Sequence, residues 1–141
     1  MKKLLNLSFL YFVFAMIGGV FYREFTKHMR FTGETTLSLI HVHLLVLGTL
    51  FFLLLLLFCK HTQLQENKKF KLFLILYNIG LPLMVIMLTI RGVLQVLQSE
   101  ITSSINGAIS GIAGLSHIIM AVAFLLFFSL LKVEVSQWDT K

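Results

Sequence analysis

Charged side chains, cysteine and acidic residues are all scarce in this sequence, and the scarcity of charge is the most informative. Only 13% of the 141 residues are charged, whereas a soluble domain carries about a quarter. The single cysteine, Cys59, cannot form a disulfide within the chain. No acidic residue falls inside a long apolar segment and no inverted repeat is visible, which argues against a proton- or metal-coupled transporter. A soluble domain and a disulfide-held fold are therefore both excluded.

The sequence is instead dominated by hydrophobic residues, which make up 57% of the chain. A helix that crosses the ~30 Å hydrocarbon core of a bilayer needs ~20 mostly apolar residues. Four segments meet this need: Leu4–Tyr22, Leu37–Cys59, Leu72–Leu97 and Ala108–Leu131. The run Leu50–Cys59 is apolar on every face, unlike the alternating strands of a membrane barrel. The sequence therefore predicts an all-α membrane protein, a single domain over residues 1–141 built as a four-transmembrane-helix bundle.

Basic residues indicate how this bundle is oriented. The first apolar segment is too long for the core of a signal peptide and no Ala-x-Ala-like site follows Tyr22, so we expect a retained helix. With the N-terminus inside, eight basic residues face the cytoplasm and four, Arg23, Lys27, Arg30 and Arg91, face outside. The eight are Lys2, Lys3, Lys60, Lys68, Lys69, Lys71, Lys132 and Lys141. Because short basic loops stay in the cytoplasm, both termini are predicted to be cytoplasmic. The net charge of +6 then reflects membrane-flanking residues, and nucleic-acid binding is not expected.

Three histidines lie inside the predicted helices, where ionisable groups are costly and usually functional. His41 and His43 open the second helix and His117 lies in the fourth, whereas His28 and His61 fall in loops. Counted from the predicted outer helix ends, His43 lies ~9 Å deep and His117 ~13.5 Å deep at 1.5 Å per residue. This difference is within the error on helix ends. The three histidines can therefore share one layer in the outer half of the bilayer.

The spacing of His41 and His43 divides them between two faces of one helix. Positions two apart point ~200° away from each other. A single small metal ion could not easily be bound by both. A flat macrocycle on one face, ligated by His43 and by His117 across the bundle, fits better. His41 would then face a second site, which is either another haem or a hydrogen bond.

Small residues and one arginine flank these histidines. Gly48 in the second helix and Gly114 in the fourth leave room for a broad cofactor such as haem. The same glycine pattern also suits close packing between helices, and the two interpretations are compatible. Arg91, near the outer end of the third helix, either extends to the membrane interface or pairs with an anionic group such as a haem propionate.

The segment His41-Val-His43-Leu-Leu-Val-Leu-Gly48 resembles the H-x-H helix of haem–copper oxidase catalytic subunits, which include the nitric oxide reductases. In that superfamily the first histidine ligates a high-spin haem and the second a low-spin haem, whose other ligand comes from a distant helix. His117 in Gly-Leu-Ser-His-Ile-Ile is similar to that distant ligand. The segment Asn78–Met84 resembles one found in small relatives, and the whole chain looks like a bacterial family of small four-helix membrane proteins of unknown function. The copper-ligating histidines of the superfamily have no counterparts in these helices, so oxygen or nitric oxide reduction is not expected, and whether the protein is an enzyme stays open.

Residues and resemblance together predict a haem b protein of the bacterial cytoplasmic membrane, with one haem or two. The expected cofactor-binding residues are His43, His117, His41, Arg91, Gly48 and Gly114, and the expected iron ligands are the histidines among them. The expected role is electron transfer, with quinone or another redox membrane protein as partner, or haem sensing or trafficking. The alternative is a cofactor-free scaffold or assembly subunit whose histidines make interhelical hydrogen bonds. A homodimer or a larger complex is expected.

Overall fold

A computed structural model of the chain describes residues 1–138, with side chains described to Ser136, so Lys141 of the charge count lies outside the described residues. Four helical spans are long and apolar enough to cross a membrane: Lys2–His28, Leu37–His61, Lys68–Val96 and Ser103–Ser136. No strand occurs in this part of the chain. The prediction of four apolar helices is therefore confirmed, and the chain has the make-up of a multi-pass membrane protein.

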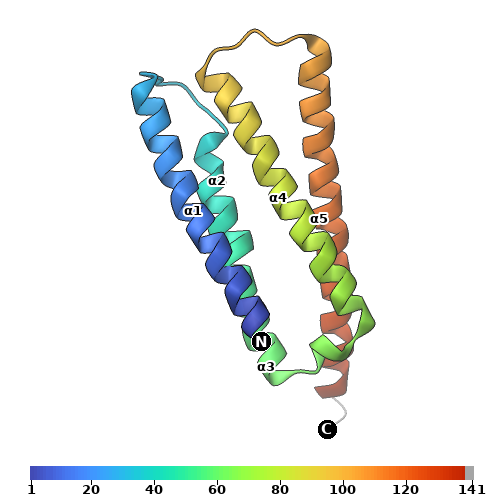
Figure 1. Cartoon of the computed structure of the whole chain (residues 1–141). Coiled ribbons are helices and arrows are strands. Elements are labelled where there is room, and N and C mark those ends of the chain that lie inside the picture. Colours follow the sequence, from blue (N-terminus) through green and yellow to red (C-terminus); the bar gives the residue numbers. More distant parts are fainter. Residues whose placement is uncertain (139–141) are drawn as a thin grey trace.

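The elements follow one another as α1 (Lys2–His28), α2 (Leu37–His43), η1 (Leu44–Leu50), α3 (Phe51–His61), η2 (Leu64–Glu66), α4 (Lys68–Val96) and α5 (Ser103–Trp138). Successive spans run in opposite directions, so the N-terminus and the end of α5 lie at the same end of the bundle (Figure 1). We call this the Met1 end and the opposite one the His28 end. The spans α2–α3 and α5 thus run parallel, from the His28 end to the Met1 end.

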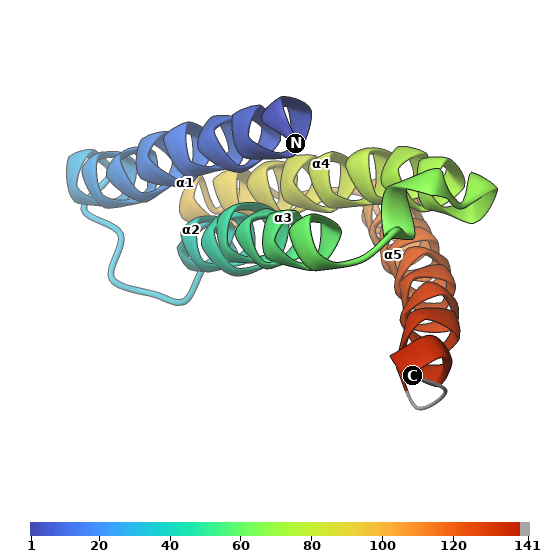
Figure 2. The same cartoon turned by 90° about the horizontal axis from the view of Figure 1, so that it is seen from below.

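The helices do not form a symmetric square. α1 packs along α2, η1 and α3, α2 packs against α4, and α4 packs along α5. Seen from the Met1 end, α5 diverges from the other helices towards its C-terminus (Figure 2). Many apolar side chains point outwards, including Phe9 and Leu125, which are 66% and 68% exposed. An apolar outer surface of this kind is what a bilayer requires, since lipid replaces water as the solvent.

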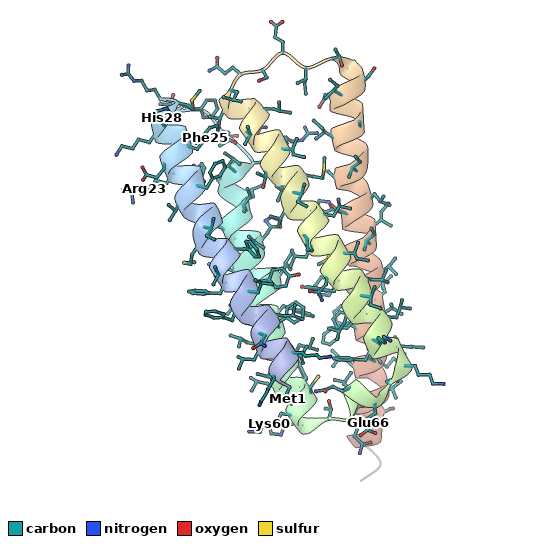
Figure 3. The ribbon with its side chains drawn as sticks, in the orientation of Figure 1. Met1, Arg23, Phe25, His28, Lys60 and Glu66 are labelled. Carbon is teal, nitrogen blue, oxygen red and sulfur yellow. The ribbon has the colours of Figure 1, made fainter. Side chains whose placement is uncertain are left out.

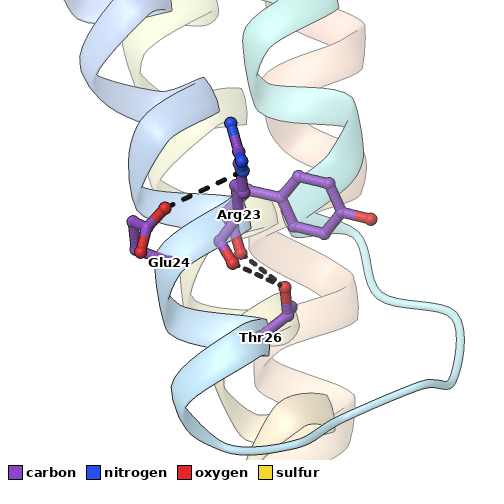
Figure 4. Close-up of polar contacts among 4 residues, drawn as sticks. Arg23, Glu24 and Thr26 are labelled. Atoms are coloured by element: carbon purple, nitrogen blue, oxygen red, sulfur yellow. Dashed lines mark hydrogen bonds and ion pairs between the residues drawn. The ribbon is translucent and has the colours of Figure 1, made fainter.

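Charged side chains gather at the two ends of the bundle. Figure 3 shows Arg23 and His28 at one end, Lys60 and Glu66 at the other, and mostly apolar side chains between them. The last turns of α1 carry an exposed ion pair, with Arg23 Nε 3.8 Å from Glu24 Oε1 (Figure 4). Thr26 donates its hydroxyl hydrogen to the Tyr22 carbonyl at 2.8 Å. α1 continues to His28, six residues beyond the predicted end of the first span at Tyr22.

A seven-residue π-helix, η1, interrupts the second span directly after His43. The wider turn of a π-helix disturbs the regular ladder of backbone bonds. Two carbonyls in η1 receive side-chain donors from other helices: Leu47 from the Tyr77 hydroxyl at 2.7 Å and Thr49 from the Ser8 hydroxyl at 2.9 Å. In an apolar environment such partners are needed because an unpaired backbone group costs several kcal/mol. α1 and α4 thus stabilise η1 from two sides.

An aromatic cluster fills the half of the bundle nearer the Met1 end. Phe51 of α3 stacks on Tyr77 of α4 with ring centroids 4.7 Å apart, and meets Phe124 of α5 edge-on at 5.4 Å. Phe73 of α4 contacts both Phe51 at 6.1 Å and Phe127 of α5 at 5.3 Å. Such pairs stabilise by about 0.5–1.5 kcal/mol beyond their burial. The cluster joins α3, α4 and α5 into one core.

Candidate functional site

His43 and His117 have the same local hydrogen bond. The Nδ1 atom of His43 lies 2.8 Å from the Leu39 carbonyl, and that of His117 lies 2.8 Å from the Ala113 carbonyl, each four residues earlier on the same helix. A carbonyl oxygen can only accept, so Nδ1 carries the hydrogen in the neutral ring. The lone pair is then on Nε2. This is the tautomer in which a histidine can bind a metal through Nε2. Both rings therefore leave Nε2 free of the bond within their own helix.

Contacts with α4 show how far along the bundle α2 and α5 begin relative to each other. Leu37, the first residue of α2, packs so closely on Gly92 that a Cβ there would lie 2.6 Å from Leu37 Cγ. Arg91, the residue before Gly92, donates a hydrogen bond of 2.8 Å from Nη2 to Ser110 Oγ on α5. Leu37 and Ser110 therefore lie near the same level along α4.

From this common level the two histidines are almost equally deep. His43 follows Leu37 by six positions and His117 follows Ser110 by seven, which correspond to ~9 Å and ~10.5 Å along their helices. Because α2 and α5 run in the same direction, these offsets point the same way. The two side chains thus belong to one layer, which we call the histidine layer.

The aromatic cluster, which lies nearer the Met1 end, also indicates that His43 and His117 are at similar depth. Phe51 and Phe124 are in contact, and they follow His43 and His117 by eight and seven positions. Phe124 lies on nearly the same face of α5 as His117, since seven residues make about two turns. His117 itself is exposed, whereas Ser116 and Met120 are buried, so His117 lies at the edge of the α5 face that packs against the bundle.

Arg91 lies on the α4 face between the two histidine-bearing helices. It follows Phe73, which touches both α3 and α5, by 18 positions, or five turns of an α-helix. Its partner Ser110 precedes His117 by seven positions, on nearly the same face of α5. A cavity of about 530 Å³ extends from Arg91 towards the His28 end, lined by polar residues that include Gln95, Ser99 and Asn106. This arrangement suits an anionic group at the edge of the histidine layer.

His41 differs from the other two histidines because it bonds to another helix. Its Nδ1 lies 3.0 Å from the Ala15 carbonyl of α1. Gly19 makes this approach possible, since a Cβ there would lie 3.1 Å from the same nitrogen. His41 therefore sits between α1 and α2, on the side of α2 away from α5, and links two helices. This hydrogen bond is one of the two environments expected for His41, and the other, a second haem, stays a prediction.

The two glycines expected beside a cofactor have different surroundings. At Gly48 a Cβ would lie 2.5 Å from Tyr11 Cβ, so α1 fills the space there. At Gly114, as at Gly107 and Gly111, nothing lies within 4 Å of an added Cβ. Gly114 therefore lies on the open outer face of α5, whereas Gly48 is needed for close packing of α1.

The remaining histidines and the cysteine do not contribute to this layer. His28 and His61 are exposed at the helix ends, and Cys59 is buried at the end of α3. Among the described residues, no three side chains of the types His, Cys, Asp and Glu gather where they could hold one metal ion. Sequence reasoning missed η1, although its position directly after His43 is typical of functional sites.

Comparison with known proteins identifies a family without adding a biochemical activity. No curated protein and no solved structure matches the chain. The resemblance of the H-x-H helix to haem–copper oxidases has no support from these comparisons and rests on the residues alone. The model of one family, described as "Protein of unknown function (DUF2871)", matches residues 1–134. Because this match spans nearly all of the 141 residues, the chain belongs to that family.

Proposed function

We propose that this protein binds haem b in the membrane, with His43 and His117 as the two axial ligands of one iron. The observation that carries the proposal is the pair of 2.8 Å bonds from Nδ1 to a carbonyl four residues earlier, made by two histidines at nearly the same depth. Each bond leaves an Nε2 lone pair without a partner among the described residues. His43 is half-buried and His117 is exposed on the outer surface of the bundle, so in a membrane each Nε2 atom would face hydrocarbon. A polar atom without a partner costs about 1–3 kcal/mol there, and haem iron is a ligand that removes this cost.

Other residues of the histidine layer fit the same cofactor. Arg91 offers a guanidinium to a propionate at the edge of the macrocycle, and its bond to Ser110 orients it towards α5. The open space beside Gly114 leaves room next to His117. When bound between two imidazoles, haem supplies a six-coordinate iron that exchanges electrons with little rearrangement. The role we propose is electron transfer with a quinone or another redox membrane protein, or the sensing or trafficking of haem.

The rival proposal is a cofactor-free scaffold, and one observation favours it at a single position. His41 makes the interhelical hydrogen bond that this function requires. His43 and His117 do not, because both bond only within their own helices in the described structure. The rival therefore explains one histidine of three, and the haem proposal explains the other two.

The direct test is the colour of the purified protein. We expect protein expressed with ample haem to show the sharp absorption of low-spin haem b, and acid extraction to release haem in a fixed ratio to the chain. Protein that remains colourless after such expression, and that takes up no haem added to detergent solution, would favour the scaffold.

The same preparation tests assembly. The exposed glycine face of α5 at Gly107, Gly111 and Gly114 suits close contact with a second helix, and we propose a homodimer or a larger complex. Native mass measurement in mild detergent should give a mass of at least two chains. A monomer that retains its haem would show that no second copy is needed.

A further inference from the structure

A groove between α1 and α4 faces the surrounding membrane on the side of the bundle away from the histidine layer. Its volume is about 600 Å³ and its lining is almost entirely apolar. Along α1 it extends from Leu7 to Phe21, a rise of ~21 Å at 1.5 Å per residue. Asn78 in its wall and Arg91 in the histidine layer are 13 positions apart on α4, which places them ~140° apart around the helix. The groove is thus a separate site.

A hydrogen-bonded pair of polar side chains, Tyr11 and Asn78, interrupts the mostly apolar wall of this groove. Tyr11 donates its hydroxyl hydrogen to Asn78 Oδ1 at 2.9 Å, and Asn78 Nδ2 donates to the Leu74 carbonyl at 2.8 Å. An amide has two hydrogens, and the second one on Asn78 has no acceptor among the described residues. Pro82, also in the wall, lacks the N–H that would bond to the Asn78 carbonyl in a regular helix. At this point the groove therefore offers both a donor and an acceptor.

The depth of Asn78 limits what can use these two groups. α4 has 29 residues, and Asn78 is only four positions, or ~6 Å, from Pro82 near its middle. The polar groups of a phospholipid lie in the interfacial regions outside the ~30 Å hydrocarbon core. They do not reach the centre of the membrane. A ligand that does must be apolar along most of its length and carry a compact hydrogen-bonding head.

We propose that this groove binds an isoprenoid quinone, with its head group beside Asn78 and its tail along α1 towards Phe21. A quinone carbonyl accepts the free hydrogen of Asn78 Nδ2. A quinol hydroxyl donates to the carbonyl that Pro82 leaves without its usual partner. The groove extends ten positions beyond Tyr11 to Phe21, or ~15 Å, which accommodates several isoprene units. Binding depends on the groove alone, whereas its use in electron transfer rests on the proposed function.

Photolabelling tests this site directly. Full-length protein in nanodiscs of synthetic phosphatidylcholine without quinone is illuminated with an azido-quinone analogue. We expect label on peptides of α1 and α4 that line the groove, and we expect it to be competed by unlabelled ubiquinone but not by added phospholipid. Asn78→Leu, which keeps the size but removes the amide, should weaken competition by roughly five- to tenfold, the loss of one hydrogen bond.

A matched pair of tryptophan variants tests the site without changing Asn78, so that a folding defect of Asn78→Leu cannot decide the result. Ile86 lines the groove and is 52% exposed, whereas Ile79 on the same helix is 51% exposed and lies outside it. Ile86→Trp should abolish the competed label and Ile79→Trp should leave it unchanged. Equal labelling of both variants, label outside the groove, or equal competition by phospholipid would overturn the proposal. The haem spectrum of the same samples separates the two sites: a colourless protein that still labels in the groove contradicts only the haem proposal.

Discussion

Gly48 of η1 lies directly against Tyr11 of α1, so close that a methyl group at Gly48 would sit 2.5 Å from Tyr11 Cβ. Tyr11 also bonds to Asn78 of α4 at 2.9 Å and stacks on Phe52 of α3 with centroids 5.6 Å apart. One tyrosine therefore contacts the other three helical elements around it. Its position depends on the absence of a side chain at Gly48.

We predict that Gly48→Ala destabilises the protein by about 1–3 kcal/mol, because the added methyl forces α1 away from η1. The matched control is Gly114→Ala on α5, where nothing lies within 4 Å of the new Cβ. There the helix preference of alanine should leave stability unchanged or raise it by up to about 1 kcal/mol. Thermal unfolding in mild detergent measures both. Equal loss in the two variants would contradict the close contact with Tyr11.

The hydroxyl of Tyr77 provides a second test, because it bonds to the Leu47 carbonyl inside the π-helix at 2.7 Å. Tyr77→Phe keeps the ring in the aromatic cluster and leaves this carbonyl without its donor. We expect a loss of about 1–3 kcal/mol. Tyr22→Phe is the control, since the Tyr22 hydroxyl makes no hydrogen bond in the described structure, and its effect should stay within about 0.5 kcal/mol. A Tyr77→Phe variant as stable as the control would mean that η1 does not need this donor.

The four spans could be predicted because long apolar runs separated by polar loops are sufficient to define membrane helices. Their ends were less predictable. The fourth span was predicted to begin at Ala108, yet α5 begins at Ser103. Thr102 explains the difference, since its Oγ1 accepts from Ile105 N at 3.4 Å and its carbonyl from Asn106 N at 3.0 Å. A threonine at this position starts the helix despite the polar residues that follow.

The site could be predicted only in part. The spacing of His41 and His43 was enough to separate them onto two faces, because helical periodicity is local. The partner of His41 was not visible in the sequence, since the Ala15 carbonyl is a backbone group that any residue supplies. η1 was missed for a similar reason. The segment Leu44–Leu50 reads as ordinary apolar helix, and its π geometry depends on donors from Ser8 and Tyr77 in distant segments.

Orientation is a prediction that fusions can test. The distribution of basic residues, eight against four, predicts that both termini are cytoplasmic. Reporter fusions after Lys141 and within residues 98–107 should therefore give opposite signals, with the cytoplasmic one at Lys141. A cytoplasmic signal from the loop would invert the bundle and place the histidine layer in the inner half of the membrane.

The measurement that tests the haem proposal most directly is the absorption spectrum of three alanine variants, purified in parallel with wild-type protein. His43→Ala and His117→Ala should each convert or abolish the same low-spin signal, since each removes one of the two Nε2 ligands. His41→Ala should keep that signal, because His41 bonds to Ala15 on the other side of α2. A shared defect of His41→Ala and His117→Ala with no effect of His43→Ala would show that the ligand pair is wrong. Identical spectra for all three variants and wild type would contradict ligation by these histidines altogether.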